Sequence, residues 1–223
     1  MVSKTLVPGA MEIHIAGERL WLLPERAAYW PRVKTLLIAD AHLGKAAAFR
    51  RAGIPVPSGT TDENLQRLTD LMSSLDVERT VFLGDMLHSR VARQTSAEAF
   101  IRWRALHAHV KMVLVRGNHD RHAGDPPDEW QVECVDEPMI VGGIALCHMP
   151  HAVEGFYAIG GHTHPSATLT GRARERVRLP CFLFTRDHAI LPAFGPFTGT
   201  ADVEPQNGDR LYVVAGAQVV AAQ

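Results

Sequence analysis

The sequence is poor in the features that mark membrane, secreted and redox-active proteins. No part of its 223 residues is an uninterrupted apolar run of the roughly 18 to 20 residues that a membrane helix needs, so we expect no membrane association. The first residues, MVSKTLVPGA, lack the apolar stretch of a signal peptide, which favours a cytoplasmic location. Cysteines are few and form no CxxC pair. We therefore expect reduced core thiols at Cys134, Cys147 and Cys181.

The chain also lacks an excess of charge of either sign. Its formal net charge is −1, so bulk charge gives no support for nucleic-acid binding, and any such interaction must depend on local patches. The sequence contains no internal repeat, low-complexity tract or long linker, which favours a single domain over residues 1–223. Histidine is the one residue type with an unusual count, at 12.

Short apolar runs rich in Val, Ile and Leu predict strands. They cover residues Glu12–Ile15, Leu20–Leu23, Thr35–Ala39, Thr80–Leu83, Lys111–Val115, Gly143–Cys147, Phe156–Ile159, Val177–Thr185 and Leu211–Ala215. Amphipathic periodicity predicts two helices, one over about 61–75 and one over about 96–109. Thr61 is a plausible cap for the first, and Glu98 lies near the positive end of the second.

The order of these elements favours one architecture. Strands and helices alternate in the first half of the chain, which favours parallel pairing with right-handed crossovers. The second half is strand after strand, which favours antiparallel pairing. We therefore expect an α/β fold in which two packed mixed β-sheets are flanked by helices.

Acidic, amide and imidazole side chains follow five of the predicted strands where each strand ends. They are Asp40 and His42, then Asp85, then Asn118 with His119 and Asp120, then His148, and finally His162 with His164. In open α/β sheets, the crevice beyond the carboxyl ends of the strands is where ligands bind. Burying so many ionisable groups together is costly without a compensating charge, and metal cations supply that charge.

The type and spacing of these side chains indicate two metal ions. An Asp-x-His or His-x-His pair places both donors on one side of an extended chain, so each pair is able to hold one ion or straddle two. Two carboxylates, one amide and four imidazoles exceed the needs of one tetrahedral zinc. They suit two ions of five or six coordination that share a bridging carboxylate and are completed by water.

This series of motifs resembles the calcineurin-like binuclear metallophosphoesterase superfamily over about residues 34 to 165. The resemblance rests on Asp40-x-His42, Gly84-Asp85, Gly117-Asn118-His119-Asp120, His148 and Gly161-His162-x-His164. The stretches LLIADAHLGKAAAFRRAGIPVP, FLGDMLHSR and GHTHP, with LPCF and LPAF, further resemble the ligase-associated DNA damage response endonucleases. Those are bacterial metallophosphoesterases encoded beside a DNA ligase, an exonuclease and a helicase. The narrower resemblance implies a functional link to these three enzymes.

The superfamily resemblance also implies the role of each ligand. One ion would be held by Asp40, His42, Asp85 and His164, and the other by Asp85, Asn118, His148 and His162, with Asp85 bridging. The resemblance implies manganese, whereas the ligand chemistry alone also accepts iron, cobalt or zinc.

The resemblance makes His119 the group that donates to the phosphate or to the leaving oxygen, with Asp120 orienting it. The hypothesis is in-line attack on phosphorus by a hydroxide held between the two ions. His88 departs from the Asp or Asn more usual in the superfamily at that position, and resembles the double-strand-break repair nucleases. It either contacts the scissile phosphate or bonds to a carbonyl in the outer shell of the site.

Basic residues that follow the metal motifs are candidates for phosphate contact. They are Lys45, Arg50, Arg51, Arg90 and Arg93. Four alternating arginines would share one face of a strand, where they either track a nucleic-acid backbone or form a solvated edge. They are Arg172, Arg174, Arg176 and Arg178. Phe49 either stacks on a base or belongs to the core.

The leading hypothesis is therefore a manganese-dependent DNA endonuclease of repair that acts on single-stranded DNA, because a compact metal cleft admits single strands easily. One alternative is a hydrolase of small phosphodiesters or nucleotide pyrophosphates. Another is a catalytically silent scaffold of the same fold that binds partner proteins, against which the complete ligand set argues.

Overall fold

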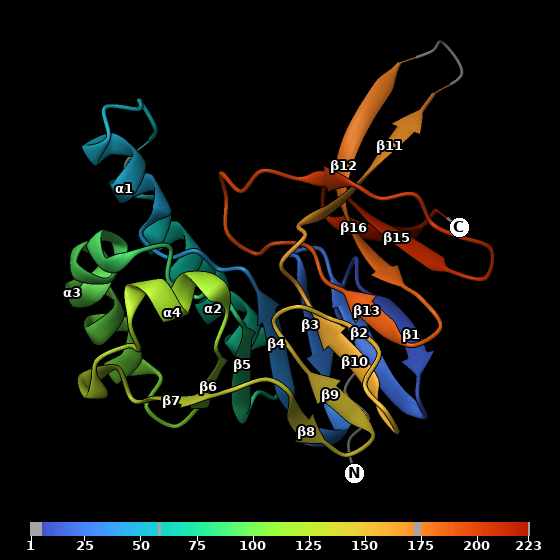
Figure 1. Cartoon of the computed structure of the whole chain (residues 1–223), viewed down its shortest axis with the longest axis horizontal. Helices are drawn as coiled ribbons and strands as arrows, with labels where there is room; N and C mark the ends of the chain where they lie inside the picture. The colour runs from blue at the N-terminus through green and yellow to red at the C-terminus, as the bar shows by residue number, and fades with distance from the viewer. Residues whose placement is uncertain (1–5, 58, 172–174, 223) are drawn as a thin grey trace.

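A computed structural model describes residues 6–57, 59–171 and 175–222. Two β-sheets lie face to face, and helices cover the outer side of the first sheet (Figure 1). This arrangement confirms the predicted α/β fold of two mixed sheets flanked by helices.

The first sheet carries its strands in chain order from β1 to β7. They are β1 Met11–Ile15, β2 Glu18–Leu23, β3 Ala27–Trp30, β4 Thr35–Ala39, β5 Arg79–Leu83, β6 Lys111–Val115 and β7 Val132–Val135. Strands β1 to β4 pair antiparallel, and β4 to β7 pair parallel. The carboxyl ends of β4, β5 and β6 therefore meet at one edge of the sheet.

The second sheet has the order β14-β11-β12-β13-β10-β9-β8, with β15 on β12 and β16 on β15. Its strands are β8 Met139–Val141, β9 Ile144–Leu146, β10 Tyr157–Gly160, β11 Pro165–Thr170, β12 Arg176–Phe184, β13 His188–Ile190, β14 Ala201–Asp202, β15 Arg210–Ala215 and β16 Gln218–Ala221. The antiparallel prediction is wrong for β10, which pairs parallel with β9 and β13. The segment between β9 and β10 crosses back over the sheet, so both strands run in the same direction.

The described residues form α1 Lys45–Arg51, α2 Thr60–Ser74, α3 Arg90–Leu106 and α4 Asn118–Ala123, with short 3-10 turns at Pro31–Val33 and Asp128–Trp130. The prediction for α2 is within one residue at each end. Helix α3 begins six residues earlier than predicted, because the Oγ of Ser89 accepts a hydrogen bond from the backbone of Ala92 and caps the helix there.

Alternate residues of the central strands supply two separate cores. On β4, Leu36 and Ile38 face the helices, where they meet Leu68 of α2 and Phe100 of α3. Leu37 and its neighbours on β5 and β6 face the second sheet instead. The strands are buried on both sides, as expected for the parallel part of a sheet. This double burial holds the carboxyl ends of β4, β5 and β6 in place.

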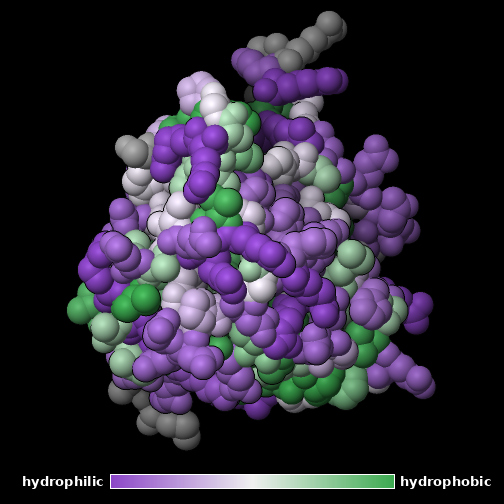
Figure 2. Space-filling model, turned by 60° about the vertical axis from the view of Figure 1, so that its left-hand side comes forward, coloured by the Kyte–Doolittle hydropathy of each residue, from purple (hydrophilic) through white to green (hydrophobic). Residues whose placement is uncertain are grey.

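The surface over the helices is mostly hydrophilic, with hydrophobic side chains confined to small areas (Figure 2). None of the helices that the structure describes is long and apolar enough to cross a membrane. Cys147 and Cys181 are buried and Cys134 is half-buried, and all three are free thiols, as predicted.

Candidate metal centre and active site

The predicted ligand residues converge from both sheets at one edge of the sandwich. Asp40 and His42 follow β4, and Asp85 follows β5. Asn118 begins α4 just after β6. The second sheet contributes His148 after β9, then His162 and His164 after β10. The carboxyl ends of strands from two sheets thus supply seven polar side chains to one place.

The first cluster joins Asp40, His42 and His164, whose donor atoms all lie within 4.8 Å of one another. The Nε2 of His164 is 3.5 Å from the Oδ1 of Asp40. Asp40 and His42 are almost completely buried, with exposed fractions of 0% and 3%. A carboxylate and two imidazoles therefore share one small volume from which water is largely excluded.

The second cluster joins Asp85, His148 and His162 in the same way. The Nε2 of His148 lies 2.9 Å from the amide oxygen of Asn118 and 2.9 Å from the Nδ1 of His162. Asp85 touches both clusters, because its Oδ1 is 3.5 Å from His148 and its Oδ2 is 3.9 Å from His42. Its carboxylate therefore stands between the two groups of donors.

Five of these seven residues have backbone torsions that L-amino acids rarely adopt. The φ angles are positive, between 43° and 71°, at Asp40, His42, Asp85, His162 and His164. A non-glycine residue in this region is strained, and such strain gathers at functional sites where the surrounding structure enforces it. The backbone turns sharply at each strand end and thereby directs these side chains into one cavity.

Two glycines permit the close approach of these segments. A Cβ on Gly84 would overlap the ring of His148, and a Cβ on Gly161 would overlap the carboxylate of Asp40. Each contact joins a ligand-bearing loop of one sheet to a loop of the other. The glycines of the Gly-Asp and Gly-His motifs are therefore required by the space available.

Several donor atoms of the two clusters have no hydrogen-bond partner, and bound cations would satisfy them. Buried atoms without a hydrogen-bond partner include the Oδ1 of Asp40, both ring nitrogens of His42 and the Nε2 of His164. Unsatisfied buried groups are rare, because each costs the free energy of its lost hydration. A bound cation would satisfy these lone pairs and offset the charges of Asp40 and Asp85, so the residues fit two divalent ions.

Two imidazoles of the site, His42 and His88, are in the neutral state that a metal ligand needs. Burial and the nearby charge of Lys45 lower the pKa of His42 to about 2. Burial, with Lys45 and His119 adding to it, lowers the pKa of His88 to about 4. Both rings are consequently neutral at pH 7 and present lone pairs.

Backbone carbonyls orient two of the rings. The Nδ1 of His148 donates to the carbonyl of Leu83 at 3.2 Å, and the Nδ1 of His164 donates to that of Gly199 at 2.9 Å. A carbonyl only accepts, so the proton resides on Nδ1 and the Nε2 lone pair faces the cluster. This is the outer-shell arrangement usual for metal-binding histidines.

The model of the calcineurin-like phosphoesterase family matches residues 33–148, which contain β4 to β9 and most of the clustered side chains. The chain is a calcineurin-like phosphoesterase. It is accordingly an enzyme of metal-dependent phosphoester hydrolysis. The resemblance inferred from the motifs alone is thereby confirmed at the level of the superfamily.

Among solved structures, this phosphoesterase is similar to a nuclease, MPE, of Pseudomonas putida. The two chains are 40% identical, with a TM-score of 0.85 over 95% of this chain and 99% of the other. The similarity therefore extends over both sheets. No curated protein matches the chain significantly.

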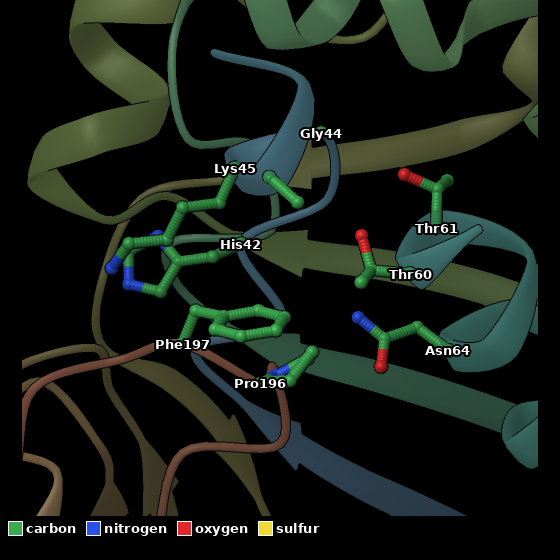
Figure 3. Close-up of a pocket in the computed structure, with 9 residues that line it drawn as sticks. His42, Gly44, Lys45, Thr60, Thr61, Asn64, Pro196 and Phe197 are labelled. Carbon is green, nitrogen blue, oxygen red and sulfur yellow. The ribbon is translucent and has the colours of Figure 1, made fainter. Parts of the chain in front are cut away.

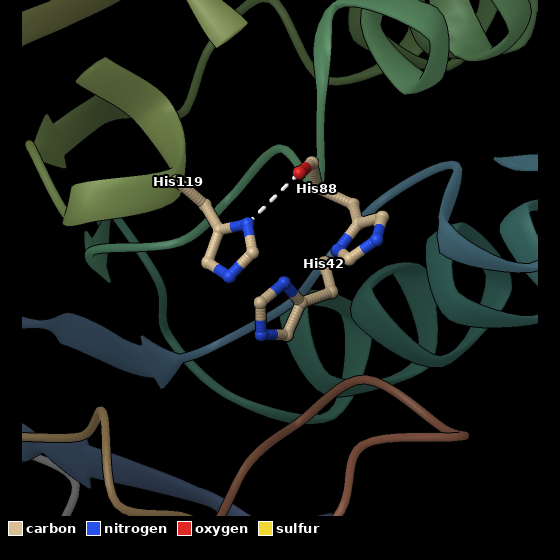
Figure 4. A group of neighbouring side chains, drawn as sticks. All are labelled: His42, His88 and His119. Atoms are coloured by element: carbon tan, nitrogen blue, oxygen red, sulfur yellow. Dashed lines mark hydrogen bonds between the residues drawn. The ribbon is translucent and has the colours of Figure 1, made fainter. Parts of the chain in front are cut away.

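His88 and His119 adjoin the first cluster and form a third group with His42 (Figure 4). The rings of His88 and His119 stack with centroids 5.1 Å apart. The Nδ1 of His119 donates to the carbonyl of His88 at 2.9 Å. The predicted orientation of His119 by Asp120 is therefore wrong, because the His88 carbonyl takes that place.

Asp120 instead joins two ligand-bearing loops. It is completely buried, and its two oxygens accept the backbone N–H groups of Leu87 and Gly117, each at 2.9 Å. Burial raises the pKa of Asp120, and the two amides oppose that shift. The carboxylate therefore holds the loop after β5 against the loop after β6.

Four of the basic residues predicted to contact phosphate have different surroundings. Lys45 is half-buried beside His42 and makes no ion pair within the described residues, and burial lowers its pKa. Arg50, Arg90 and Arg93 are tied to backbone carbonyls, of Pro57, His122 and Asp125 respectively. Of these four cations, Lys45 is therefore the one that lines the cleft beside His42.

Of the alternating arginines, Arg176 and Arg178 lie on β12, whose hairpin with β11 projects from the rest of the chain (Figure 1). Arg172 and Arg174 are outside the described residues. Arg178 is 2.9 Å from Asp202 and also bonds to Ser166. These contacts favour the solvated edge over contact with a nucleic-acid backbone at this position. Arg176 is exposed.

Two features of the site were absent from the sequence analysis. Glu137 accepts the backbone N–H groups of His148 and Met149, at 2.7 and 3.1 Å, and so holds the loop after β9. A cleft also runs from His42 to the start of α2 and is closed on one side by Phe197 (Figure 3). No local motif marks either feature, since both depend on segments distant in sequence.

Proposed function

We propose that this phosphoesterase is a manganese-dependent endonuclease that cleaves single-stranded DNA. The observation that carries the proposal is the pair of adjoining donor clusters with Asp85 between them. The similarity to a nuclease over nearly the whole chain supports a phosphodiester substrate. The sequence resemblance to ligase-associated repair endonucleases supports a role in DNA repair beside a ligase, an exonuclease and a helicase.

In this proposal the two ions are held by the residues of the two clusters. Asp40, His42 and His164 hold one, and Asn118, His148 and His162 hold the other, while Asp85 contributes to both. When bound, such ions activate water and withdraw charge from the phosphate oxygens. The neutral state of the buried His42 suits this role, because a protonated imidazole cannot be a ligand.

His119 is the proposed proton donor to the leaving oxygen. Its Nδ1 donates to the carbonyl of His88, which leaves Nε2 as the atom that holds the transferred proton. The same carbonyl keeps the ring in place whether Nε2 is protonated or not. His88 stacks on this ring, and Lys45 lies beside His42, so both are proposed to contact the non-bridging oxygens of the phosphate.

The test is incubation of the protein with closed circular single-stranded DNA and Mn²⁺. A circle has no ends, so its conversion to a linear product requires internal cleavage. We expect cleavage with Mn²⁺, none with a chelator, and none for Asp85→Ala, because this substitution removes the carboxylate between the clusters. Glu154→Gln is the matched control, since Glu154 is an exposed acid outside the clusters.

A parallel assay with bis(p-nitrophenyl) phosphate distinguishes the alternatives. Hydrolysis of this ester without any cleavage of DNA would identify a hydrolase of small phosphodiesters and overturn the nuclease proposal. Failure to hydrolyse either substrate, with both metal ions bound, would point to the catalytically silent scaffold.

A further inference from the structure

Phe197 is an exposed aromatic residue at the edge of the metal clusters. It is 44% exposed, whereas the apolar residues Ala41 and Leu43, which follow β4, are completely buried. It lines one cleft together with His42 of the first cluster and with Lys45. Figure 3 shows its ring directed into this cleft, with His42 on one side and Thr60 and Asn64 on the other.

The loop that carries Phe197 is attached firmly to the metal motif. Phe194 and Gly195 donate backbone hydrogen bonds to the carbonyls of Ala39 and Asp40, at 2.8 and 3.0 Å. Arg67 lies over the ring of Phe194, 3.7 Å from its centroid, and also bonds to its carbonyl. The position of Phe197 relative to Asp40 is therefore determined by several contacts.

The backbone of Phe197 is strained. Its φ is 58°, in the left-handed region that a bulky residue rarely adopts. Because the ring is exposed, its burial does not offset this strain. Strain of this kind is retained where it serves a function.

The opposite wall of the cleft is polar. Thr60 and Asn64, at the start of α2, are 7% and 4% exposed and line this wall. The cleft is narrow and open to solvent on one side. An aromatic surface facing an amide and a hydroxyl matches a nucleobase, which has an apolar face and a polar edge.

We propose that the base of a nucleotide adjoining the scissile phosphate stacks on Phe197 and directs its edge toward Asn64. The inference rests on the proposed nuclease function and extends it to the form of the substrate. A base within a duplex is already paired and stacked, so only an unpaired base enters the cleft without disruption of a duplex. Phe197 then accounts for a preference for single-stranded DNA.

Phe49 is the other aromatic residue near the clusters, and its surroundings differ. It is half-buried on α1, 5.9 Å from the ring of His88, and Lys45 lies over its ring. The ring of Phe49 is thus already close to two other side chains. Phe197 is the better base-stacking residue of the two.

The test is a double-mutant cycle between the ring and the base. Phe197→Gly suits the left-handed backbone, so the loop is retained and only the ring is lost. Binding of a labelled single-stranded oligonucleotide and of its abasic counterpart is measured by fluorescence anisotropy in a His119→Ala background, in which cleavage is slow. Phe156→Ala is the control, since Phe156 is an exposed aromatic residue at the opposite end of β10.

We expect Phe197→Gly to weaken binding of the normal oligonucleotide about tenfold and that of the abasic one hardly at all. Phe197→Tyr should bind like the wild type, because tyrosine retains the aromatic face. Equal effects on both oligonucleotides, or no effect on either, would overturn the inference. Failure of the wild type to cleave single-stranded DNA would instead overturn the proposed function. That outcome is tested on the wild type alone, before any variant is made.

Discussion

The Nδ1 of His119 lies 2.9 Å from the carbonyl oxygen of His88, and this contact determines which ring nitrogen is available for chemistry. Since the carbonyl accepts, Nδ1 carries a proton and Nε2 remains available for proton transfer. The same segment that supplies the His88 ring thus orients His119 through its backbone. Substitution of the His88 side chain leaves this carbonyl in place, so the two histidines have separable roles.

Replacement of His119 by alanine should lower turnover while both metal ions stay bound. Loss of a general acid typically reduces the rate by about 10² to 10⁴-fold. Hydrolysis of bis(p-nitrophenyl) phosphate gives the rate, and elemental analysis of the purified protein gives the metal content. His14→Ala, an exposed histidine on β1, is the control. Full activity of His119→Ala would end the assignment of His119 as proton donor.

Replacement of Gly161 by alanine should weaken metal binding. The added methyl group would overlap the carboxylate of Asp40, so Asp40 or the loop that carries His162 must shift. Disturbed support of metal ligands typically costs about 10- to 100-fold in affinity. Titration with Mn²⁺ measures the change. Gly143→Ala has open space around its new methyl group and should bind Mn²⁺ normally; equal affinity in both variants would contradict the close-contact argument.

Replacement of Ser89 by alanine should destabilise the protein without altering the site. The Oγ of Ser89 accepts the backbone N–H of Ala92 at 3.1 Å and caps α3. Loss of such a cap costs about 1 kcal/mol in the free energy of unfolding. Urea denaturation measures the difference. Ser89→Asp, which retains an acceptor, should restore most of the stability, and an unchanged midpoint for Ser89→Ala would place the start of α3 elsewhere.

Acidification should destabilise the fold through His107. Burial lowers the pKa of this imidazole, and His109 and Arg104 lower it further. The unfolded state therefore binds the proton more readily, and stability decreases as the pH falls below about 6.5 toward the lower pKa of the folded state.

The measurement is the urea midpoint of the wild type and of His107→Gln between pH 5 and 8. Glutamine keeps a polar contact to Thr69, whose Oγ1 lies 3.0 Å from the Nε2 of His107, but it has no proton to gain. The wild type should lose more stability on acidification than the variant. Parallel pH profiles would show that His107 does not contribute.

The sequence by itself determined which metal-ligand motif follows each strand along the chain. Each ligand motif directly follows a short apolar run, so strand and ligand are encoded together, and the pattern of Asp40 to His164 was readable without a structure. The amphipathic period likewise predicted α2 within one residue. Local signals of this kind persist because hydrophobic spacing and metal-ligand type are properties of neighbouring residues.

The tertiary structure alone decided which distant groups meet. Asp40 and His164 come from different sheets, and their contact depends on packing across the sandwich. The carbonyls that orient His119 and His164 have no sequence signature, because every residue has a carbonyl group. Because the His88 carbonyl could not be recognised in the sequence, Asp120 was predicted as the group that orients His119. The place of Phe197 beside His42 also arises only when the loop after β13 packs on the end of β4.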